Sequence, residues 1–164
     1  MPLTIRQLTM SDWDAIKSIY LEGIKTKNAT FQTEAPTCEA WFASHVPECT
    51  IGCFEDEKLQ GFATLNKIST RAVYAGVAEV SVYVASNARG KGVGQFLMES
   101  LIELSESQGY WMLQSGIFPE NTASLKLHYK NGFREVGRRE RIGNMDGKWR
   151  DTLLLERRSQ KVGV

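Results

Sequence analysis

The segment that decides the fold is Ala78-Glu79-Val80-Ser81-Val82-Tyr83-Val84, followed shortly by Arg89-Gly90-Lys91-Gly92-Val93-Gly94. The first part is rich in β-branched residues and predicts a strand. The second part opens a helix expected over residues 92–108, with apolar side chains at helical spacing and Gly109 after its last turn. A strand, a glycine-rich turn and a long helix in succession indicate an α/β fold.

Working outward, further strands and helices are expected on both sides of this segment. Ser11 is expected to cap the first helix, with Asp14 three positions later. Asp56-Glu57 predicts a tight hairpin turn. The other strands are expected at residues 3–7, 50–55, 58–66, 112–117, 134–142 and 148–156, and the other helices at residues 39–44 and from 119–121 to 131–132. This order predicts a mixed, mostly antiparallel central sheet.

Length and charge narrow the class of protein. The 164 residues, without repeats or a linker, fit one domain over residues 1–164, since domains commonly have ~100–200 residues. The net charge of +1 does not show the excess of positive charge that is typical of proteins that bind nucleic acid or an anionic membrane. The sequence has no apolar run near the ~20 residues of a membrane helix and no signal-peptide pattern at the N-terminus. We therefore expect a soluble, cytoplasmic protein.

Three cysteines, Cys38, Cys49 and Cys53, lie near His45, so a metal site must be considered. The paired C-x-x-C pattern of structural zinc sites is absent. We expect reduced thiols that serve as small apolar residues, and no metal.

The turn Arg89–Gly94 has the features of a pyrophosphate site. Glycines at alternate positions leave backbone N–H groups open at a helix N-terminus, where the helix dipole favours an anion. Arg89 and Lys91 add two cations. The spacing is neither that of a nucleotide P-loop nor that of a Rossmann fingerprint.

Two motifs in this order resemble the GNAT superfamily of N-acetyltransferases. Arg89-x-x-Gly92-x-Gly94 is similar to its coenzyme A pyrophosphate loop, and Asn121-x-x-Ser124 followed by Gly132-Phe133 is similar to the helix that contacts the pantetheine arm. The resemblance implies acetyl-CoA as co-substrate and a GNAT-like sheet with helices on both faces. It also implies a set of coenzyme contacts, namely Val82, Tyr83, Val84, Arg89, Gly90, Lys91, Gly92, Val93, Gly94, Asn121, Ser124 and Lys130.

Other segments resemble the phosphinothricin and methionine sulfoximine acetyltransferase branch. They are residues 29–37, Arg71-x-x-Tyr74, residues 79–84 and Gly147-Lys148-Trp149-x-Asp151. This resemblance implies a small amine acceptor and a homodimer. It also implies acceptor contacts from Phe31, Glu34, Arg71, Tyr74, Glu79 and Trp149, with Arg71 as a fork for an acid group. Ala75 and Val80 depart from the branch pattern, which weakens the assignment of one particular acceptor.

Acyl transfer to an amine needs a base, a donor for the thioester carbonyl and stabilisation of the leaving thiolate. Glu79 is the candidate base: it interrupts an apolar strand, and a half-buried carboxylate there would have a raised pKa. The alternative is an edge-strand carboxylate that faces water. His128, with Tyr129 beside it, occupies the position at which many GNAT enzymes carry a tyrosine acid, although His128 could equally be a structural histidine.

Besides a nucleotide-binding module, which a thermal shift with ATP but none with acetyl-CoA would support, the sequence leaves two other functions open. The first is acetylation of a protein or peptide amine from the same coenzyme site. The second is a catalytically silent acyl-CoA sensor, against which an intact Glu79 argues. We expect direct transfer in a ternary complex because the three cysteines lie far from the coenzyme loop and have no associated base motif.

Overall fold

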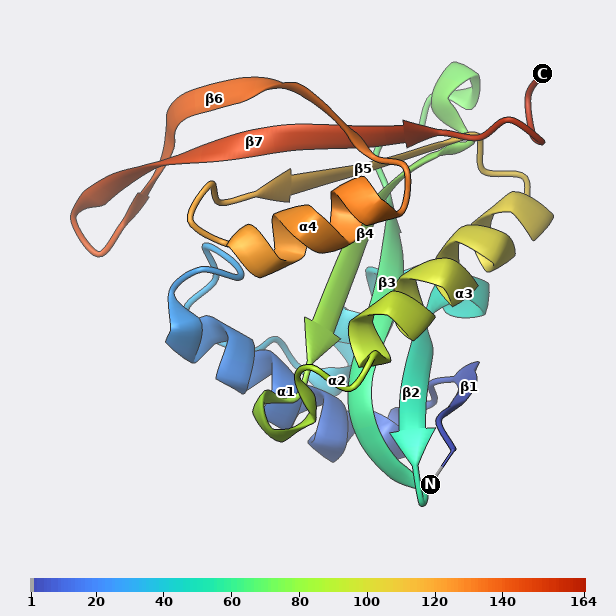
Figure 1. Ribbon diagram of the computed structural model, residues 1–164, viewed down its shortest axis with the longest axis vertical. Helices are drawn as coiled ribbons and strands as arrows, with labels where there is room; N and C mark the ends of the chain where they lie inside the picture. Colours follow the sequence, from blue (N-terminus) through green and yellow to red (C-terminus); the bar gives the residue numbers. More distant parts are fainter. Residues whose placement is uncertain (1) are drawn as a thin grey trace.

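A computed structural model describes residues 2–164 as one seven-stranded sheet with helices on both faces (Figure 1). The strand order is β1-β2-β3-β4-β5-β7-β6, and the β4–β5 pair is parallel while the other pairs are antiparallel. The strands are β1 (Thr4–Gln7), β2 (Ile51–Glu55), β3 (Lys58–Lys67), β4 (Val77–Val84), β5 (Met112–Ile117), β6 (Arg134–Met145) and β7 (Lys148–Arg158). The expected fold class, a mixed and mostly antiparallel sheet, is confirmed.

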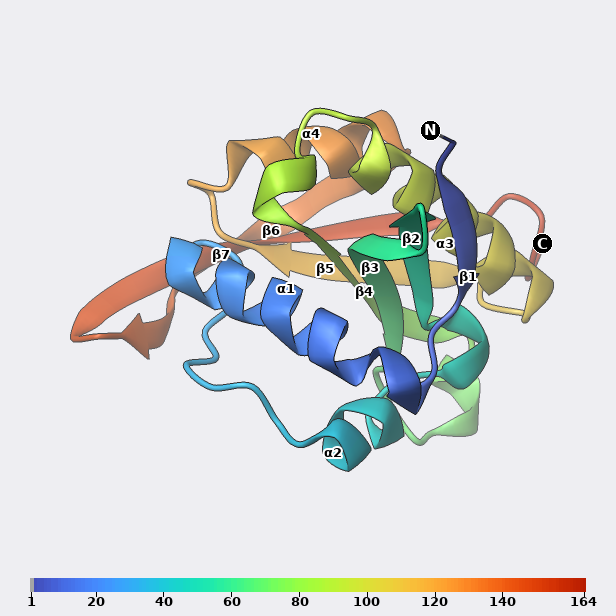
Figure 2. The same ribbon diagram turned by 90° about the horizontal axis from the view of Figure 1, so that it is seen from below.

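Two helices lie on each face of the sheet (Figure 2). One face carries α1 (Trp13–Thr26) and α2 (Cys38–Ala43), and the other carries α3 (Val93–Ser107) and α4 (Thr122–Lys130). Short 3-10 turns complete the chain at Met10–Asp12, Pro47–Cys49, Ala72–Tyr74 and Ser86–Ala88. Within residues 2–164, no helix is both long and apolar enough to cross a membrane.

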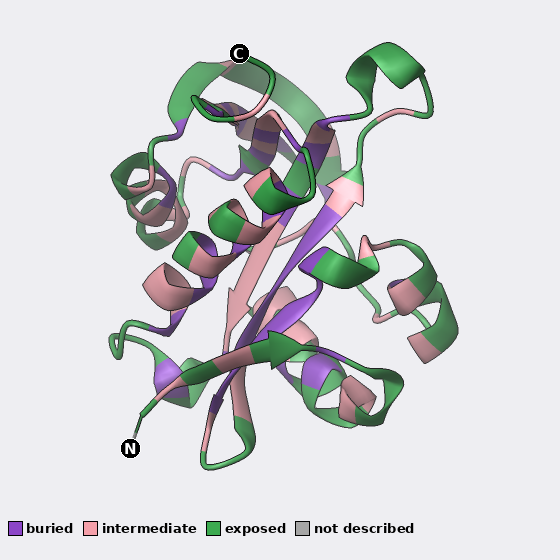
Figure 3. Cartoon of the chain, turned by 90° about the vertical axis from the view of Figure 1, so that its right-hand side faces the viewer, coloured by how far each residue is buried: buried purple, intermediate pink, exposed green. Residues whose placement is uncertain are grey.

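Alternation along β4 separates the two layers. Val80 lies against the α3 side and is 3% exposed, whereas Tyr83 points toward α1, where its ring lies 5.3 Å from that of Tyr20. Side chains on successive strand positions point to opposite faces, so this alternation is the expected one. Buried residues follow the central strands, and exposed ones follow the outer helix faces and the β6–β7 hairpin (Figure 3).

Two local expectations are corrected by the structure. The cap before α1 is formed by Thr9 and Asp12, not by Ser11 and Asp14: the Thr9 backbone N–H donates to Asp12 Oδ2 at 2.9 Å. Asp12 also receives the Arg6 guanidinium, which lowers the pKa of its carboxyl. In addition, β6 runs to Met145, because it pairs with β7 up to a two-residue turn at Asp146-Gly147.

Strands β4 and β5 diverge after a short parallel pairing. They pair over Val77–Glu79 and Met112–Gln114 only, and beyond Glu79 they separate (Figure 1). The β4 edge from Val80 to Val84 therefore opens toward a cavity instead of a neighbouring strand. This opening is the feature of the fold that creates a site.

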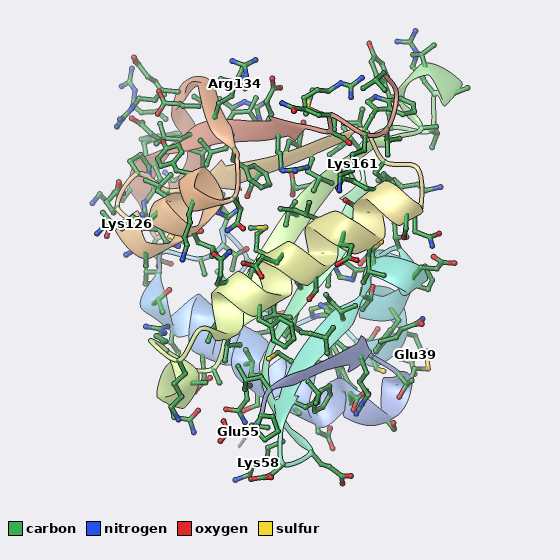
Figure 4. The ribbon with its side chains drawn as sticks, turned by 45° about the vertical axis from the view of Figure 1, so that its right-hand side comes forward. Glu39, Glu55, Lys58, Lys126, Arg134 and Lys161 are labelled. Carbon is green, nitrogen blue, oxygen red and sulfur yellow. The ribbon has the colours of Figure 1, made fainter. Side chains whose placement is uncertain are left out.

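The surface charges are spread over the molecule. Lys58 lies at the β2–β3 turn, and Arg134 lies at the start of β6, at the opposite end (Figure 4). With 20 basic and 19 acidic residues, the chain as a whole is close to neutral.

Candidate functional site

A cavity of about 800 Å³ lies where β4 and β5 separate, between the N-termini of α3 and α4. We call it the first cavity. Its wall on one side is β4 from Glu79 to Val84, and on the other side β5 from Ser115 to Ile117. Its volume is in the range of small-molecule and cofactor sites. The predicted residues that line it are Phe31, Glu79, Val82, Tyr83, Val84, Arg89, Gly90, Gly92, Val93, Gly94, Asn121, Ser124 and His128.

The glycine-rich turn closes one end of the first cavity. Gly90 and Gly92 have φ angles of 76° and 82°, a left-handed backbone that favours glycine, and Gly92 caps α3. A Cβ atom at either position would meet no heavy atom within 4 Å, so the space before the turn is open. The first N–H groups of α3 therefore face this cavity without a protein partner in the helix, as an anion site requires.

Asn121 fixes the second wall of the first cavity. Its side-chain oxygen accepts from the Ser124 N–H at 3.2 Å, which caps α4. Its amide donates to the Asn28 carbonyl at 3.0 Å, which ties α4 to the segment after α1. Asn28 also lines this cavity, and no sequence signal singled it out.

A buried arginine on β7 reinforces this junction. Arg150 is 8% exposed, and its guanidinium donates to the Lys27 carbonyl, to Asn28 Oδ1 at 2.8 Å and to Glu120 Oε1 at 2.9 Å. It also lies 3.9 Å from the centroid of the Phe118 ring. This one side chain on β7 thus joins two segments that line the first cavity, the one at Asn28 and the one at Phe118 and Glu120, and no sequence pattern singled it out.

A second cavity of about 750 Å³ adjoins the first one on the α1/α2 side of the sheet. Its floor is formed by β3 and β4 and its walls by α2 and the segment 30–36, including Glu34. The two cavities have Thr30, Gln32, Glu79, Ser81 and Tyr83 in common. A group held in one cavity can therefore reach a group held in the other next to Glu79.

Glu79 lies at this junction with an exposed side chain, not the half-buried one expected from the sequence. It is the last residue of β4 that pairs with β5, opposite Gln114, and it opposes Asn66 on β3. A carboxylate in this place is free to accept a proton from a group entering either cavity.

His128 is 4% exposed and lines the first cavity. Its Nδ1 lies 2.7 Å from the Ser124 carbonyl, which can only accept, so Nδ1 carries the proton of the neutral ring. Its buried Nε2 has no partner among residues 2–164. Burial lowers the pKa of His128, although the Ser124 carbonyl opposes this shift. The ring is therefore neutral near pH 7 and has an acceptor at Nε2.

Several predicted residues lie outside both cavities. Lys91, Lys130 and the 45%-exposed Tyr129 do not line them. Arg71 and Tyr74 lie in the exposed loop before β4, with the guanidinium 5.4 Å from the tyrosine ring centroid. Trp149 is 58% exposed on the β6–β7 hairpin. The structure thus does not gather the predicted acceptor set in one place: Phe31 lines the first cavity, Glu34 the second and Glu79 both.

The cysteines are placed as structural residues. Cys49 and Cys53 are fully buried, Cys38 is half-buried, and none of them lines either cavity. Burial raises the pKa of Cys49 to about 11, which keeps it a thiol. Among residues 2–164, no group of three or more histidine, cysteine or acidic side chains is arranged to hold a metal ion.

Comparisons with known proteins identify a family and relatives for this chain. The model of the acetyltransferase (GNAT) family matches residues 10–133. The phosphinothricin N-acetyltransferase of Alcaligenes faecalis is 32% identical, over 94% of this chain and 81% of that protein. The L-methionine sulfoximine/L-methionine sulfone acetyltransferase of Pseudomonas aeruginosa is 26% identical, over 95% and 94%.

A solved structure shows the same fold. The GNAT superfamily phosphinothricin acetyltransferase of Sinorhizobium meliloti, crystallised with AcCoA, superposes with a TM-score of 0.89 at 24% identity. The match covers 99% of this chain and 91% of that one.

Proposed function

Since the chain belongs to the acetyltransferase (GNAT) family, we propose that it moves an acetyl group from acetyl-CoA to the amine of a small, amino-acid-like acceptor. The observation that carries this proposal is the pair of cavities that meet at Glu79. Acetyl-CoA occupies the first cavity and the acceptor the second, so that thioester and amine meet beside one carboxylate.

The coenzyme is held by groups at both ends of the first cavity. Its pyrophosphate lies at the turn Arg89–Gly94, where backbone N–H groups, the α3 dipole and Arg89 favour an anion. Its pantetheine arm runs along the open β4 edge at Val82, Tyr83 and Val84 and past Asn121 and Ser124. Lys91 and Lys130 supply long-range positive charge from outside the cavity.

Glu79 accepts the proton of the acceptor amine, directly or through a water, and the free amine attacks the thioester carbonyl. The β4 backbone next to it supplies N–H donors for the developing oxyanion. Transfer is direct, within a ternary complex, because no cysteine lines either cavity to serve as an intermediate nucleophile. His128 remains the candidate acid for the leaving thiolate, after it takes up a proton at Nε2. Tyr129 would have to turn inward to replace it.

The acceptor is an α-amino acid of the phosphinothricin or methionine sulfoximine kind. The named activities of the relatives support this class. The second cavity supports it as well, because it is lined by the carboxylates of Glu34 and Glu79 and by aromatic rings. The exposed loop that carries Arg71 begins at Lys67, on the rim of this cavity. When this loop folds over the cavity, Arg71 binds the acceptor carboxylate.

The chain acts as a homodimer. Ile142 and Trp149, which are 48% and 58% exposed on the protruding β6–β7 hairpin, support an interface there (Figure 1). Light scattering on the eluting protein gives the mass, and a monomer at micromolar concentration would contradict this part of the proposal.

A thiol-release assay tests the function. We expect acetyl-CoA turnover with small amino acids, much poorer turnover with their decarboxylated amines, and loss of that preference in Arg71→Ala. Polyamines, aminoglycosides and peptides belong in the same panel. A tenfold preference for peptides would place the acceptor elsewhere, and absence of turnover with every amine would leave only acyl-CoA binding.

A further inference from the structure

Thr64 is a fully buried residue with an unused hydroxyl. It lies on β3 in the floor of the second cavity, is 0% exposed, and its Oγ1 has no hydrogen-bond partner among residues 2–164. By contrast, the buried Thr50 donates from its hydroxyl to the Val46 carbonyl at 2.7 Å. Buried polar groups are nearly always bonded, and leaving one unpaired is unfavourable. The Thr64 hydroxyl is therefore a candidate hydrogen-bond partner for a ligand bound in this cavity.

The side chains around Thr64 form three cross-strand pairs in register on β3 and β4. They are Phe62 with Tyr83, Thr64 with Ser81, and Asn66 with Glu79, and all six line the second cavity. The first pair is apolar: the two rings lie 5.1 Å apart, and Trp41 packs on Phe62 at 5.6 Å. The floor thus changes from aromatic to hydroxyl to carboxylate along one direction.

These pairs set the length of a matching ligand. Neighbouring pairs on one face are roughly 7 Å apart, because a strand rises about 3.3 Å per residue. An amine held at Glu79 would therefore reach the level of Thr64 with an atom about five bonds away. Beyond that atom only a short apolar end fits against the aromatic pair.

The charged side chains around the second cavity indicate which kind of ligand atom suits the Thr64 hydroxyl. The ionisable side chains that line the second cavity are Glu34, Glu79, Lys67, His45 and the tyrosines Tyr20 and Tyr83. Lys67 is exposed at the rim, and burial lowers the pKa of His45, which keeps it neutral near pH 7. No cation lies at the level of Thr64 in the cross-strand pairs, so its hydroxyl suits a neutral oxygen better than an anion.

We propose that Thr64 determines acceptor specificity by hydrogen bonding a neutral side-chain oxygen of an amino acid that carries a short apolar end beyond it. This rests on the proposed function and narrows its acceptor: a sulfone or sulfoxide amino acid fits, a thioether lacks the oxygen, and a phosphinate brings an uncompensated charge. A site with a buried polar group discriminates strongly against ligands that leave it unpaired.

The test compares Thr64→Val with Thr50→Val, using methionine sulfone, methionine and phosphinothricin as acceptors. Wild type should favour the sulfone over methionine by roughly tenfold in kcat/KM, and Thr64→Val should reduce this ratio to near one by raising KM for the sulfone. Its kcat/KM for methionine should change much less than that for the sulfone, and should rise if it changes, because valine leaves no hydroxyl unpaired beside the thioether. Thr50→Val, which removes a buried hydroxyl outside both cavities, should keep the wild-type ratio.

Thermal unfolding separates specificity from structure. Valine fills the space of threonine without an unpaired hydroxyl, so Thr64→Val should unfold at the wild-type temperature or above it, whereas Thr50→Val should unfold lower. Retained sulfone preference in Thr64→Val, or a wild-type preference for methionine or phosphinothricin, would overturn the inference but not acetyl transfer. If wild type acetylates no amine, the proposed function fails, and calorimetric titration of methionine sulfone into both proteins with coenzyme A bound still tests Thr64. Equal affinities, or no binding to wild type, would then reject its role.

Discussion

Replacing Gly92 by alanine probes the glycine-rich turn with a cost that the structure defines. Gly92 caps α3 at a φ of 82°, and an added Cβ would meet no heavy atom within 4 Å. The penalty on the protein is therefore that of the left-handed backbone alone, about 1–2 kcal/mol. For a domain of this size such a loss lowers the midpoint of thermal unfolding by roughly 2–8 °C.

The same methyl group should interfere with the coenzyme. It projects into the open space in front of the turn, and relief of the backbone strain would turn the first α3 N–H groups away from the pyrophosphate. We expect the Kd for acetyl-CoA to rise at least tenfold, about 1.4 kcal/mol, in calorimetric titrations at a temperature where the variant is folded.

Gly109 provides a matched control at the other end of α3. Its φ is 89°, an added Cβ would again meet nothing within 4 Å, and it lines neither cavity. Gly109→Ala should lose the same stability and keep wild-type affinity for acetyl-CoA. If Gly92→Ala binds acetyl-CoA as tightly as Gly109→Ala, the turn does not hold the pyrophosphate.

Three further changes test other parts of the site. Glu79→Gln should keep coenzyme affinity and lose roughly 100–10,000-fold in turnover, with a deficit that shrinks as rising pH deprotonates the amine; wild-type rates across pH would exclude Glu79 as the base. Arg150→Met removes the donor to the Lys27 carbonyl and its neighbours, so urea unfolding should show a loss of about 2–3 kcal/mol in the free energy of unfolding. Acetyl-CoA should also bind more weakly. An unchanged urea midpoint would contradict the role of Arg150 at the junction. Burial lowers the pKa of both His45 and His128. The unfolded chain therefore binds more protons below about pH 6.5, so the free energy of unfolding should decrease as the pH is lowered through that range. Replacing both histidines by glutamine should flatten this part of the profile, and an equally steep profile would assign the pH dependence to other groups.

The central elements could be predicted because local patterns agree there. Alternation from Glu79 to Val84 correctly assigns the two faces of β4, and Gly109 correctly marks the end of α3. Asp56 and Glu57 adopt positive φ angles in the expected two-residue turn. The cap before α1 was misplaced because Ser11/Asp14 and Thr9/Asp12 have the same three-residue spacing, and only the contact with Arg6 favours the latter.

The layout of the site depends on contacts between distant residues, which local patterns do not encode. Asn28 joins the site only because Asn121 and Arg150 bind it. Glu79 lies where the pairing of β4 with β5 ends, and the spacing of residues within β4 carries no trace of that end. Thr64 could have been found by pairing β3 against β4 from their hairpin-like order, since it then opposes Ser81.

The position of β7 between β5 and β6 has a consequence for biosynthesis. β5 pairs with β7 from Met112 with Arg158 to Ile117 with Leu153, so a gap of 36 residues separates the nearest partners. At ~5–20 residues per second a ribosome needs roughly 2–7 s to cross that gap. Until β7 is made, β5 lacks its partner on this edge, and Asn28 still lacks Arg150. Unpaired edges of this kind can recruit other strands, so the chain is open to wrong strand pairing until β7 joins β5.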